Sequence, residues 1–267
     1  MSIKLEQPKF GGAPVGMSAA EWQARCELAA AYQLADIYGM SDMAGTHFSM
    51  IVPGVDNQYL LNPFGRFYEE ITASSLMKVD HEGNVISGST DAINISGFKI
   101  HGSVHKARPD LACIIHTHTE AINAIGMREE GLLPLTQKAL TMLGFLAYHD
   151  FEGPAVGMQS DEQVRLLANI GEHGRCIIMR NHGGMTVGAT VAEAFVWMYK
   201  LESACRFQIA GQASQSKLVR PSDDIIARSV ETGSKVYSRG GIAECGILEW
   251  PALIRKLERE RGTSYRS

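Results

Sequence analysis

The segment from Ala112 to Ala121 reads ACIIHTHTEA, an apolar run that leads directly into two histidines. Consecutive apolar residues of this kind are typical of a buried β-strand, and side chains two apart on a strand point to the same face. We therefore expect His116 and His118 to project side by side from the end of an interior strand. Each imidazole left without a partner there would cost about 1–3 kcal/mol. A divalent metal would satisfy both rings, and ordinary hydrogen bonds are the alternative.

A second apolar run, CIIM at 176–179, is followed after two polar residues by His182 and then by two glycines. Glycine permits a close approach of the backbone beside a site. A catalytic metal needs three protein ligands and an open position for water or substrate. We therefore predict that His116, His118 and His182 bind a metal. The alternative is that His182 caps a turn while the other two histidines bind backbone carbonyls.

Strand-like and helical segments alternate along the sequence, which predicts a single α/β domain with a sheet covered by helices. Ser18 and Glu21 form a capping-box pattern at the start of a helix that runs to Tyr38. The domain is expected to span 1–267, with a loose arm at 1–17 and a C-terminal helical extension at 222–267. The other expected helices are 72–79, 98–107, one from near 119, 134–143, 160–171 capped by Ser160, 191–210 and two after 222; the other expected strands are 47–52, 59–62 and 85–87.

The composition narrows the class of partner. The formal net charge of −4 and the absence of Lys/Arg clusters argue against nucleic acid or an anionic membrane surface. No apolar run approaches the roughly 20 residues that span a bilayer, and the N-terminal residues lack the apolar core of a signal peptide. The five cysteines are scattered, which fits reduced thiols better than disulfides. We expect a cytoplasmic protein with a small-molecule substrate.

Two blocks of this sequence resemble a known family. HGSVHKARPDLACIIHTHTEA and MRNHGGMTVGATVAEAFVWMYKLESAC are similar to the two signature blocks of the class II aldolase/adducin family, and the resemblance extends from about Trp22 to Gln208. LLNPFG, EITASSLMKV, GLLPLTQKAL and AYHDFEG resemble its adducin-like bacterial branch. The resemblance implies a three-layer α/β/α sandwich around a mostly antiparallel sheet. It also implies a homotetramer with sites near subunit interfaces, and a metal on the three histidines, zinc first, with manganese or iron as alternatives.

The sequence departs from the sugar-phosphate aldolases of this family at their catalytic glutamate. An ungapped match through ARPD places Gly97 at that position. A positioned acid or base typically contributes about 10²–10⁴-fold to a rate, so its loss matters. The stretches that grip phosphate in those aldolases also differ, because they read here as HFS at 47–49 and NPFG at 62–65. A phosphorylated sugar is therefore not the expected substrate.

We predict a metal-dependent carbon–carbon lyase for a small unphosphorylated oxo- or hydroxy-acid, with decarboxylation slightly ahead of aldol cleavage. Decarboxylation needs an electron sink but no base to take a hydroxyl proton. A proton must still return to the product. The predicted proton donors are His149, Tyr148 and His101; the predicted substrate-binding residues are Arg180, Gln137 and His47; His105 is a weaker site candidate, and His81 and His173 are expected to be solvated.

Two other functions stay open. Three neutral histidines with open positions suit an Fe(II) oxygenase, although its usual triad keeps a carboxylate and none stands out in the sequence. The other is a non-enzymatic assembly module, since the adducin head resembles this chain. The missing glutamate favours that role, and the absence of a long adducin-like tail weakens it.

Overall fold

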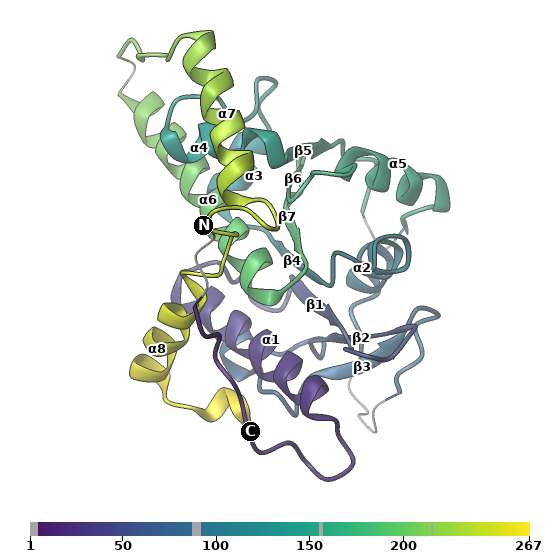
Figure 1. Ribbon diagram of the computed structural model, residues 1–267. Coiled ribbons are helices and arrows are strands. Elements are labelled where there is room, and N and C mark those ends of the chain that lie inside the picture. The colour runs from purple at the N-terminus through teal and green to yellow at the C-terminus, as the bar shows by residue number, and fades with distance from the viewer. Residues whose placement is uncertain (1–4, 87–91, 155–156, 215) are drawn as a thin grey trace.

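Seven strands form one mixed sheet in the computed structural model, which describes residues 5–86, 92–154, 157–214 and 216–267 (Figure 1). The strands are β1 (His47–Ile51), β2 (Gln58–Leu61), β3 (Met77–Asp80), β4 (Cys113–Thr117), β5 (Leu146–His149), β6 (Cys176–Met179) and β7 (Gly183–Gly188). Their order across the sheet is β3-β2-β1-β4-β7-β6-β5. Every neighbouring pair is antiparallel apart from β5 and β6, which are parallel. The predicted, mostly antiparallel sheet is confirmed.

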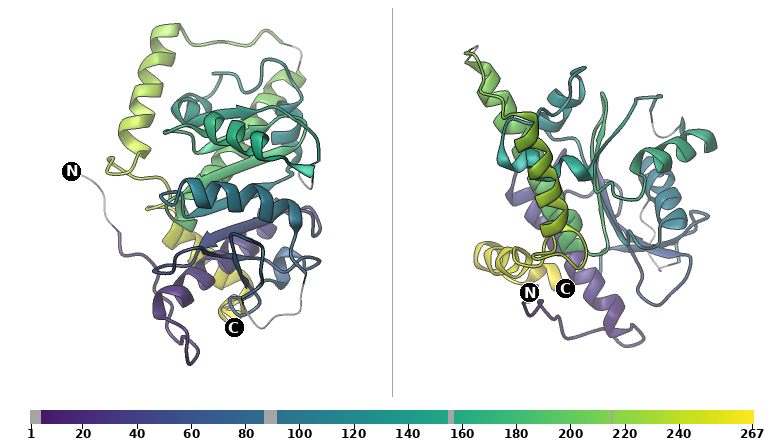
Figure 2. Two further views of the ribbon diagram at one scale, coloured as in Figure 1. Left: turned by 90° about the vertical axis from the view of Figure 1, so that its right-hand side faces the viewer. Right: turned by 45° about the horizontal axis from the view of Figure 1, so that its top comes forward.

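Helices cover both faces of this sheet. On one face lie α2 (Ile95–Ala107) and α5 (Ser160–Ile170), seen in front of the strands in the left view of Figure 2. The opposite face carries α1 (Ala19–Ile37), α3 (Glu120–Gly126), α4 (Gln137–Met142), α6 (Val191–Ala213), α7 (Asp223–Tyr237) and α8 (Trp250–Arg261). Short 3₁₀ helices are η1 (Tyr68–Glu70), η2 (Leu143–Phe145) and η4 (Ser264–Arg266). The predicted α/β/α layering is therefore confirmed.

The period-2 alternation of the central strands gives each face its own apolar core. In β4, Ile114 packs with the α2 and α5 side, whereas Ile115 packs with the α1 and α6 side. On β6, Ile177 packs on the α2 and α5 side and Ile178 on the α1 and α6 side. A strand buried on both faces reads as a continuous apolar run, which is why these two were visible in the sequence. His116 continues the Ile114 face and thus lies on the side of α2.

Several sequence-based boundaries are correct, and some are wrong. Ser18 caps α1 as expected, and its hydroxyl accepts from the Glu21 backbone. The helix expected at 72–79 is absent: residues 73–75 form a turn, and β3 follows. There the hydroxyl of Ser75 bonds both the N–H and the C=O of Thr72, which favours a turn over a helix. Ser160 is the first residue of α5 and not its cap.

The remaining expectations concern smaller segments. Of the strand expected at 85–87, Val85 forms a single bridge to Val79, and residue 87 lies outside the described residues. The sequence analysis did not anticipate β5. Residues 5–17 form no helix or strand, yet Phe10 is buried against Tyr265. All five cysteines are buried and unpaired, as expected.

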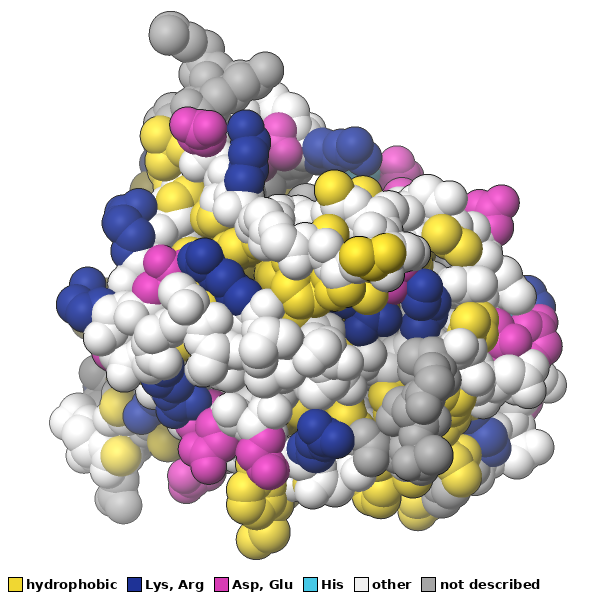
Figure 3. Space-filling view, turned by 90° about the horizontal axis from the view of Figure 1, so that it is seen from below, with side chains coloured by type: hydrophobic (Ala, Val, Ile, Leu, Met, Phe, Trp, Pro, Cys, Tyr) yellow, Lys and Arg dark blue, Asp and Glu magenta, His cyan; other side chains and the backbone are white. Residues whose placement is uncertain are grey.

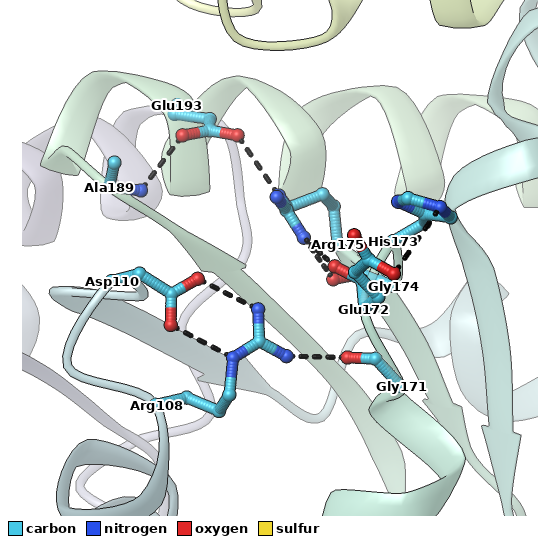
Figure 4. A network of polar contacts seen from close by, with 9 residues as sticks. All are labelled: Arg108, Asp110, Gly171, Glu172, His173, Gly174, Arg175, Ala189 and Glu193. Carbon is cyan, nitrogen blue, oxygen red and sulfur yellow. Dashed lines mark hydrogen bonds and ion pairs between the residues drawn. The ribbon is translucent and has the colours of Figure 1, made fainter.

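Two arginines join the layers at one end of the sheet (Figure 4). The Arg108 guanidinium, just beyond α2, donates to both carboxylate oxygens of Asp110 and to the carbonyl of Gly171 at the end of α5. This contact lowers the pKa of Asp110. Arg175 pairs with Glu193 in the first turn of α6, with 3.3 Å between Nε and Oε1. These ion pairs tie the helices of both faces to the strand ends.

The outer surface carries charges of both signs. On the face shown in Figure 3, lysine and arginine side chains alternate with aspartate, glutamate and apolar groups. Among the described residues, no helix is both long enough and apolar enough to cross a membrane.

Candidate metal centre

Three histidines converge where β4 meets the turn between β6 and β7. His116 is on β4, His118 lies one residue beyond it, and His182 is in the turn. One nitrogen from each ring lies within 4.8 Å of the others. Because Thr117 pairs with Gly184 across β4 and β7, the turn is brought against the end of β4. The sequence analysis predicted this group, and the structure brings its three rings together.

The two glycines after His182 allow this approach. A Cβ on Gly183 would lie 2.5 Å from the carbonyl oxygen of Thr117, and one on Gly184 would lie 2.9 Å from the Ile122 side chain. Asn181 adopts a φ of 56° in the turn, a left-handed conformation that asparagine tolerates better than most residues. The NHGG sequence therefore permits the tight turn that presents the third histidine.

Hydrogen bonds fix the tautomers of two of the three rings. His116 donates its Nδ1–H to the carbonyl of Gly184 at 3.0 Å, and His118 donates its Nδ1–H to Oδ2 of Asp42 at 2.9 Å. In its neutral form each ring then has a lone pair on Nε2, and these two nitrogens lie 3.0 Å apart. Two lone pairs cannot hydrogen-bond to each other, whereas a cation between them satisfies both. The donor set therefore fits a divalent metal, with Asp42 in the usual outer-shell position.

The electrostatics favour the neutral form of His116 and His182, which is the form that binds a metal. Burial, with smaller contributions from the neighbouring histidines, holds the pKa of His116 well below its ordinary value. Burial, His118 and His149 together lower the pKa of His182 to about 4. His118 and His182 are only partly buried, so the centre opens toward solvent on their side.

His47 occupies the space beside the centre that a side chain at position 97 would need. It pairs across the sheet with His116, and the two ring centroids are 5.0 Å apart. A Cβ added to Gly97 would lie 2.7 Å from the His47 ring. The glycine is therefore required by the packing of this histidine, and the residue predicted to bind substrate is a buried neighbour of the triad.

His149 lies on the other side of the centre, at the end of β5. The side-chain amide of Asn169 donates to its Nδ1 at 3.0 Å, so the ring proton is on Nε2. That Nε2–H is buried without an acceptor, and the nearest carboxylate oxygen, of Glu162, is 3.9 Å away. His149, Arg180 and His182 line a small cavity of about 10 Å³, enough for about one water.

The other predicted site residues have different surroundings. The Tyr148 hydroxyl accepts from the Leu132 backbone, and its ring stacks 4.7 Å from the guanidinium of Arg180. Arg180 reaches the rim of the small cavity, but it donates to the carbonyl of Arg128 and pairs with Asp150. The structure does not bring Tyr148 to the triad.

Gln137 and His101 also lie away from an open cleft. Gln137 is exposed at the start of α4, which packs against α6 and α7. His101 and His105 do share a face of α2, as their spacing predicts, but both are fully buried against β1.

Asp42 and Ser49 were not predicted from the sequence. Asp42 lies in the loop before β1, in SDMAGTH, where nothing in the spacing marks its contact with His118. Ser49 was named only as part of HFS, although its position two residues after His47 on a strand places both on one face.

A mixed α/β sandwich with three convergent histidines at its strand ends is the arrangement of the class II aldolases. This chain belongs to that family: the model for the Class II Aldolase and Adducin N-terminal domain matches residues 26–209. A Caulobacter vibrioides protein provisionally named as a class 2 aldolase is 43% identical, over 91% of this chain and 92% of its own length. Alpha-adducin of Mus musculus is 40% identical, over 88% of this chain and 33% of the adducin.

Solved structures agree with the fold. An aldolase II superfamily protein from Pseudomonas syringae has a TM-score of 0.87 and 40% identity, covering 94% of this chain and 98% of that one. The L-fuculose 1-phosphate aldolase from Glaciozyma antarctica has a TM-score of 0.79 at 24% identity, covering 97% and 98%, and supports the fold alone.

Proposed function

We propose that this protein is a metal-dependent lyase that breaks a carbon–carbon bond in a small, unphosphorylated oxo- or hydroxy-acid, by decarboxylation or aldol cleavage. The observation that carries the proposal is the convergence of the three histidine rings, with Nδ1 of His116 bonded to Gly184, Nδ1 of His118 bonded to Asp42, and their Nε2 atoms 3.0 Å apart. Zinc suits three imidazoles best, with manganese or iron as alternatives. When bound, the metal polarises an oxygen of the substrate and stabilises the negative charge that develops during cleavage.

The residues around the triad can complete the reaction. Cleavage leaves an electron pair on carbon, which must take up a proton. His149 lines the cavity it shares with His182, and its Nε2 is buried without a hydrogen-bond partner. We assign His149 as the proton donor; it gives up Nε2–H from the imidazolium form, which requires the side-chain oxygen of Asn169 to turn toward Nδ1–H, and the neutral ring regains its proton from solvent. A single water in the cavity could carry the proton to the product.

The local packing supports a substrate without phosphate. His47 and Ser49 of the HFS stretch are buried and bonded to histidines of α2, so neither is free to bind a phosphate group. Asn62, the first residue of NPFG, is buried and its side-chain oxygen accepts from the Tyr32 hydroxyl. His47, Ser49 and Asn62 therefore make their hydrogen bonds within the protein, whereas Phe64 and Gly65 of the second stretch are exposed.

The first test is metal content. Protein purified without added metal is expected to contain close to one zinc, manganese or iron per chain by elemental analysis. His118→Ala should abolish retention and leave the circular dichroism spectrum unchanged. His173→Ala, which changes an exposed histidine, is the matched control and should retain the metal. Retention in His118→Ala would refute the ligand assignment.

The second test is turnover. The metal-loaded protein is incubated with a panel of small oxo- and hydroxy-acids, and release of carbon dioxide or an aldehyde is measured. His149→Gln should lower turnover about 10²–10⁴-fold, as expected for loss of a positioned acid. Preferential cleavage of a phosphorylated sugar would contradict the proposed substrate class.

Two alternative functions predict different results. The 40% identity to alpha-adducin favours a non-catalytic assembly module, for which the wild-type protein would retain no metal and cleave no acid. Iron together with oxygen consumption would indicate an oxygenase. Its usual carboxylate ligand is not supplied by Asp42, which bonds to Nδ1 of His118.

The proposal extends to assembly and location. The family resemblance favours a homo-oligomer, and we propose a homotetramer. We also propose that it acts on a small molecule in the cytoplasm. Light scattering of the purified protein measures the assembly directly.

A further inference from the structure

A cleft of about 480 Å³ lies between α1, α4, α6 and α8, four of the helices that cover one face of the sheet (Figure 1). A volume of this size is typical of small-molecule sites. Apolar and aromatic side chains and three lysines form most of its lining. The cleft shares no lining residue with the small cavity beside the metal centre. It is therefore a second candidate site, separate from the three histidines.

Three aromatic rings line the cleft. Phe195 and Tyr199 are four residues apart on α6 and share a face of that helix, and Tyr38 is the C-cap residue of α1. The rings of Tyr38 and Tyr199 meet edge to face with their centroids 5.1 Å apart, and Phe195 lies 6.3 Å from Tyr38. Phe195 is buried, whereas Tyr199 is exposed. These rings can therefore pack against a planar, apolar group that enters from solvent.

Two of the lysines rest on aromatic rings and not on carboxylates. Nζ of Lys138, on α4, lies 5.1 Å from the ring centroid of Tyr199 and 5.3 Å from that of Phe207. Nζ of Lys200, on α6, is buried without a hydrogen-bond partner and lies 3.4 Å from the ring centroid of Tyr237. Neither ammonium forms an ion pair with any residue that the structure describes. A ring face attracts an ammonium, but it does not replace a carboxylate as acceptor for the N–H groups.

The other charges of the cleft do not cancel this excess. Lys256 is already paired with Glu260, one turn further along α8. Glu249 also lines the cleft, and it forms no ion pair within the described part of the chain. Burial, and then the charge of Lys200, lowers the pKa of Lys138, as expected where a second cation lies nearby. The cleft therefore carries a net positive charge beside its aromatic rings.

We propose that this cleft binds a small aromatic carboxylate. The ring of the ligand packs against Tyr38 and Tyr199, and its carboxylate accepts from the ammonium of Lys138, while Lys200 adds to the attraction. A ring that carries its carboxylate directly matches the short distance between Nζ of Lys138 and the ring of Tyr199. The site is independent of the proposed lyase, because an acid bound there does not contact the three histidines.

The first experiment compares three ligands on the wild-type protein. Calorimetric titration with benzoate, benzamide and acetate should show at least about 10-fold tighter binding of benzoate, because benzamide lacks the charge and acetate lacks the ring. Each titration is repeated after metal has been removed by chelation and dialysis, and the affinities should not change. Equal affinities for the three ligands, or a benzoate affinity that is lost with the metal, overturns the proposal.

Two substitutions test the charges in opposite directions. Lys138→Met keeps the apolar stem without the ammonium and should weaken benzoate binding about 10-fold, whereas Glu249→Gln removes a repulsive charge and should strengthen it severalfold. A misfolded variant cannot produce this gain. Lys235→Met and Glu231→Gln are the controls, because they change the same charges in an exposed ion pair on α7, and both should bind benzoate as the wild-type protein does. An unchanged affinity in either cleft variant overturns the proposal.

Crystallography locates the ligand. Crystals grown with 4-iodobenzoate should show the anomalous signal of iodine between α6 and α8, beside Tyr199. A cleft without this signal overturns the proposal, whether the iodine lies at the three histidines or a second copy of the chain fills the space. Metal content and turnover play no part in this result, so the aromatic-acid site and the proposed lyase can fail separately.

Discussion

Asp42 determines which nitrogen of His118 is free to bind a metal. Its carboxylate lies 2.9 Å from Nδ1, so it holds the ring proton there and directs Nε2 toward His116. Outer-shell carboxylates of this kind typically change metal affinity by about 10–100-fold. Asp42 is half-exposed, so its substitution leaves no buried charge without a partner.

Asp42→Asn is expected to weaken zinc binding about 10–100-fold without unfolding the protein, because a neutral amide oxygen is a poorer acceptor for Nδ1–H. Competition against a chelator of known affinity measures the change. Asp56→Asn, at an exposed loop position, should bind zinc as the wild-type protein does. Equal affinity in both variants would show that Asp42 does not support the centre.

At the residue scale, the sequence predicts the triad but not its supporting contacts. His116 and His118 follow an apolar strand at a spacing of two, and His182 repeats the pattern, so local periodicity is enough. Asp42 reaches His118 across 76 residues of sequence, and its position depends on how the loop before β1 packs. The substitution of glycine at position 97 is visible in the sequence, whereas the ring that fills the space is not.

At the scale of the elements, α3 depends on a carboxylate from another helix. Oε2 of Glu202, on α6, accepts from the Thr119 hydroxyl at 2.6 Å and from the Ile122 backbone at 3.3 Å. Thr119, the N-cap residue, makes no cap bond with its own side chain. Glu202 therefore supplies the hydrogen-bond acceptor for the N-terminal donors of α3, the helix that begins just after His118.

Glu202→Ala is expected to lower the free energy of unfolding by about 1–3 kcal/mol, because it leaves buried donors without an acceptor. Urea unfolding measures the loss. Glu231→Ala, on the exposed face of α7, removes only the exposed ion pair with Lys235 and should leave the free energy of unfolding close to that of the wild-type protein. A similar small effect for Glu202→Ala would mean that water replaces the carboxylate.

The buried histidines of α2 make stability depend on pH. In the unfolded protein they take up protons near pH 6.5, whereas in the folded protein burial lowers the pKa of His105 to about 3 and holds that of His101 well below its ordinary value. Between those values the unfolded state binds more protons. Each histidine's contribution to the free energy of unfolding is therefore complete above pH 6.5. It is lost as the pH falls below that value, by about 1.4 kcal/mol per pH unit.

His105→Gln should therefore reduce the pH dependence of the unfolding free energy between pH 6 and 4 by about 1.4 kcal/mol per unit. Urea unfolding at several pH values measures the slope. His173→Gln, which changes an exposed histidine, should leave the slope unchanged. An unchanged slope in His105→Gln would indicate that the histidine is protonated in the folded protein.

Elements with strong local signals were predictable, and those defined by pairing were not. The capped helices α1 and α6 and the apolar strands β4 and β6 were expected at nearly their observed positions. The segment at 72–79 was expected to be a helix but forms a turn and β3, because the Ser75 hydroxyl bonds the N–H and C=O of Thr72. β5 becomes a strand by pairing with β6, which no local pattern reveals.

At the scale of the whole molecule, the metal centre joins parts of the fold that are distant in sequence. His116 lies on β4, His118 follows it, and His182 belongs to the turn between β6 and β7. Unfolding separates these segments and removes the site. A metal that binds only the folded state must therefore stabilise the complete domain and not one loop.

Zinc at 100 times its dissociation constant should stabilise the folded protein by about 2.7 kcal/mol, which corresponds to a rise in Tm of roughly 5–10 °C for a protein of this size. Calorimetry before and after addition of a chelator measures the shift. His118→Ala should show no shift, and His173→Ala should show the full one. His116 and His118 belong to the end of β4, whereas His182 belongs to the turn between β6 and β7, so the metal holds both parts of the sheet together. The calorimetric unfolding transition should therefore shift as a single peak. If unfolding gave two peaks and zinc shifted only one of them, the strands that carry the histidines would not unfold together.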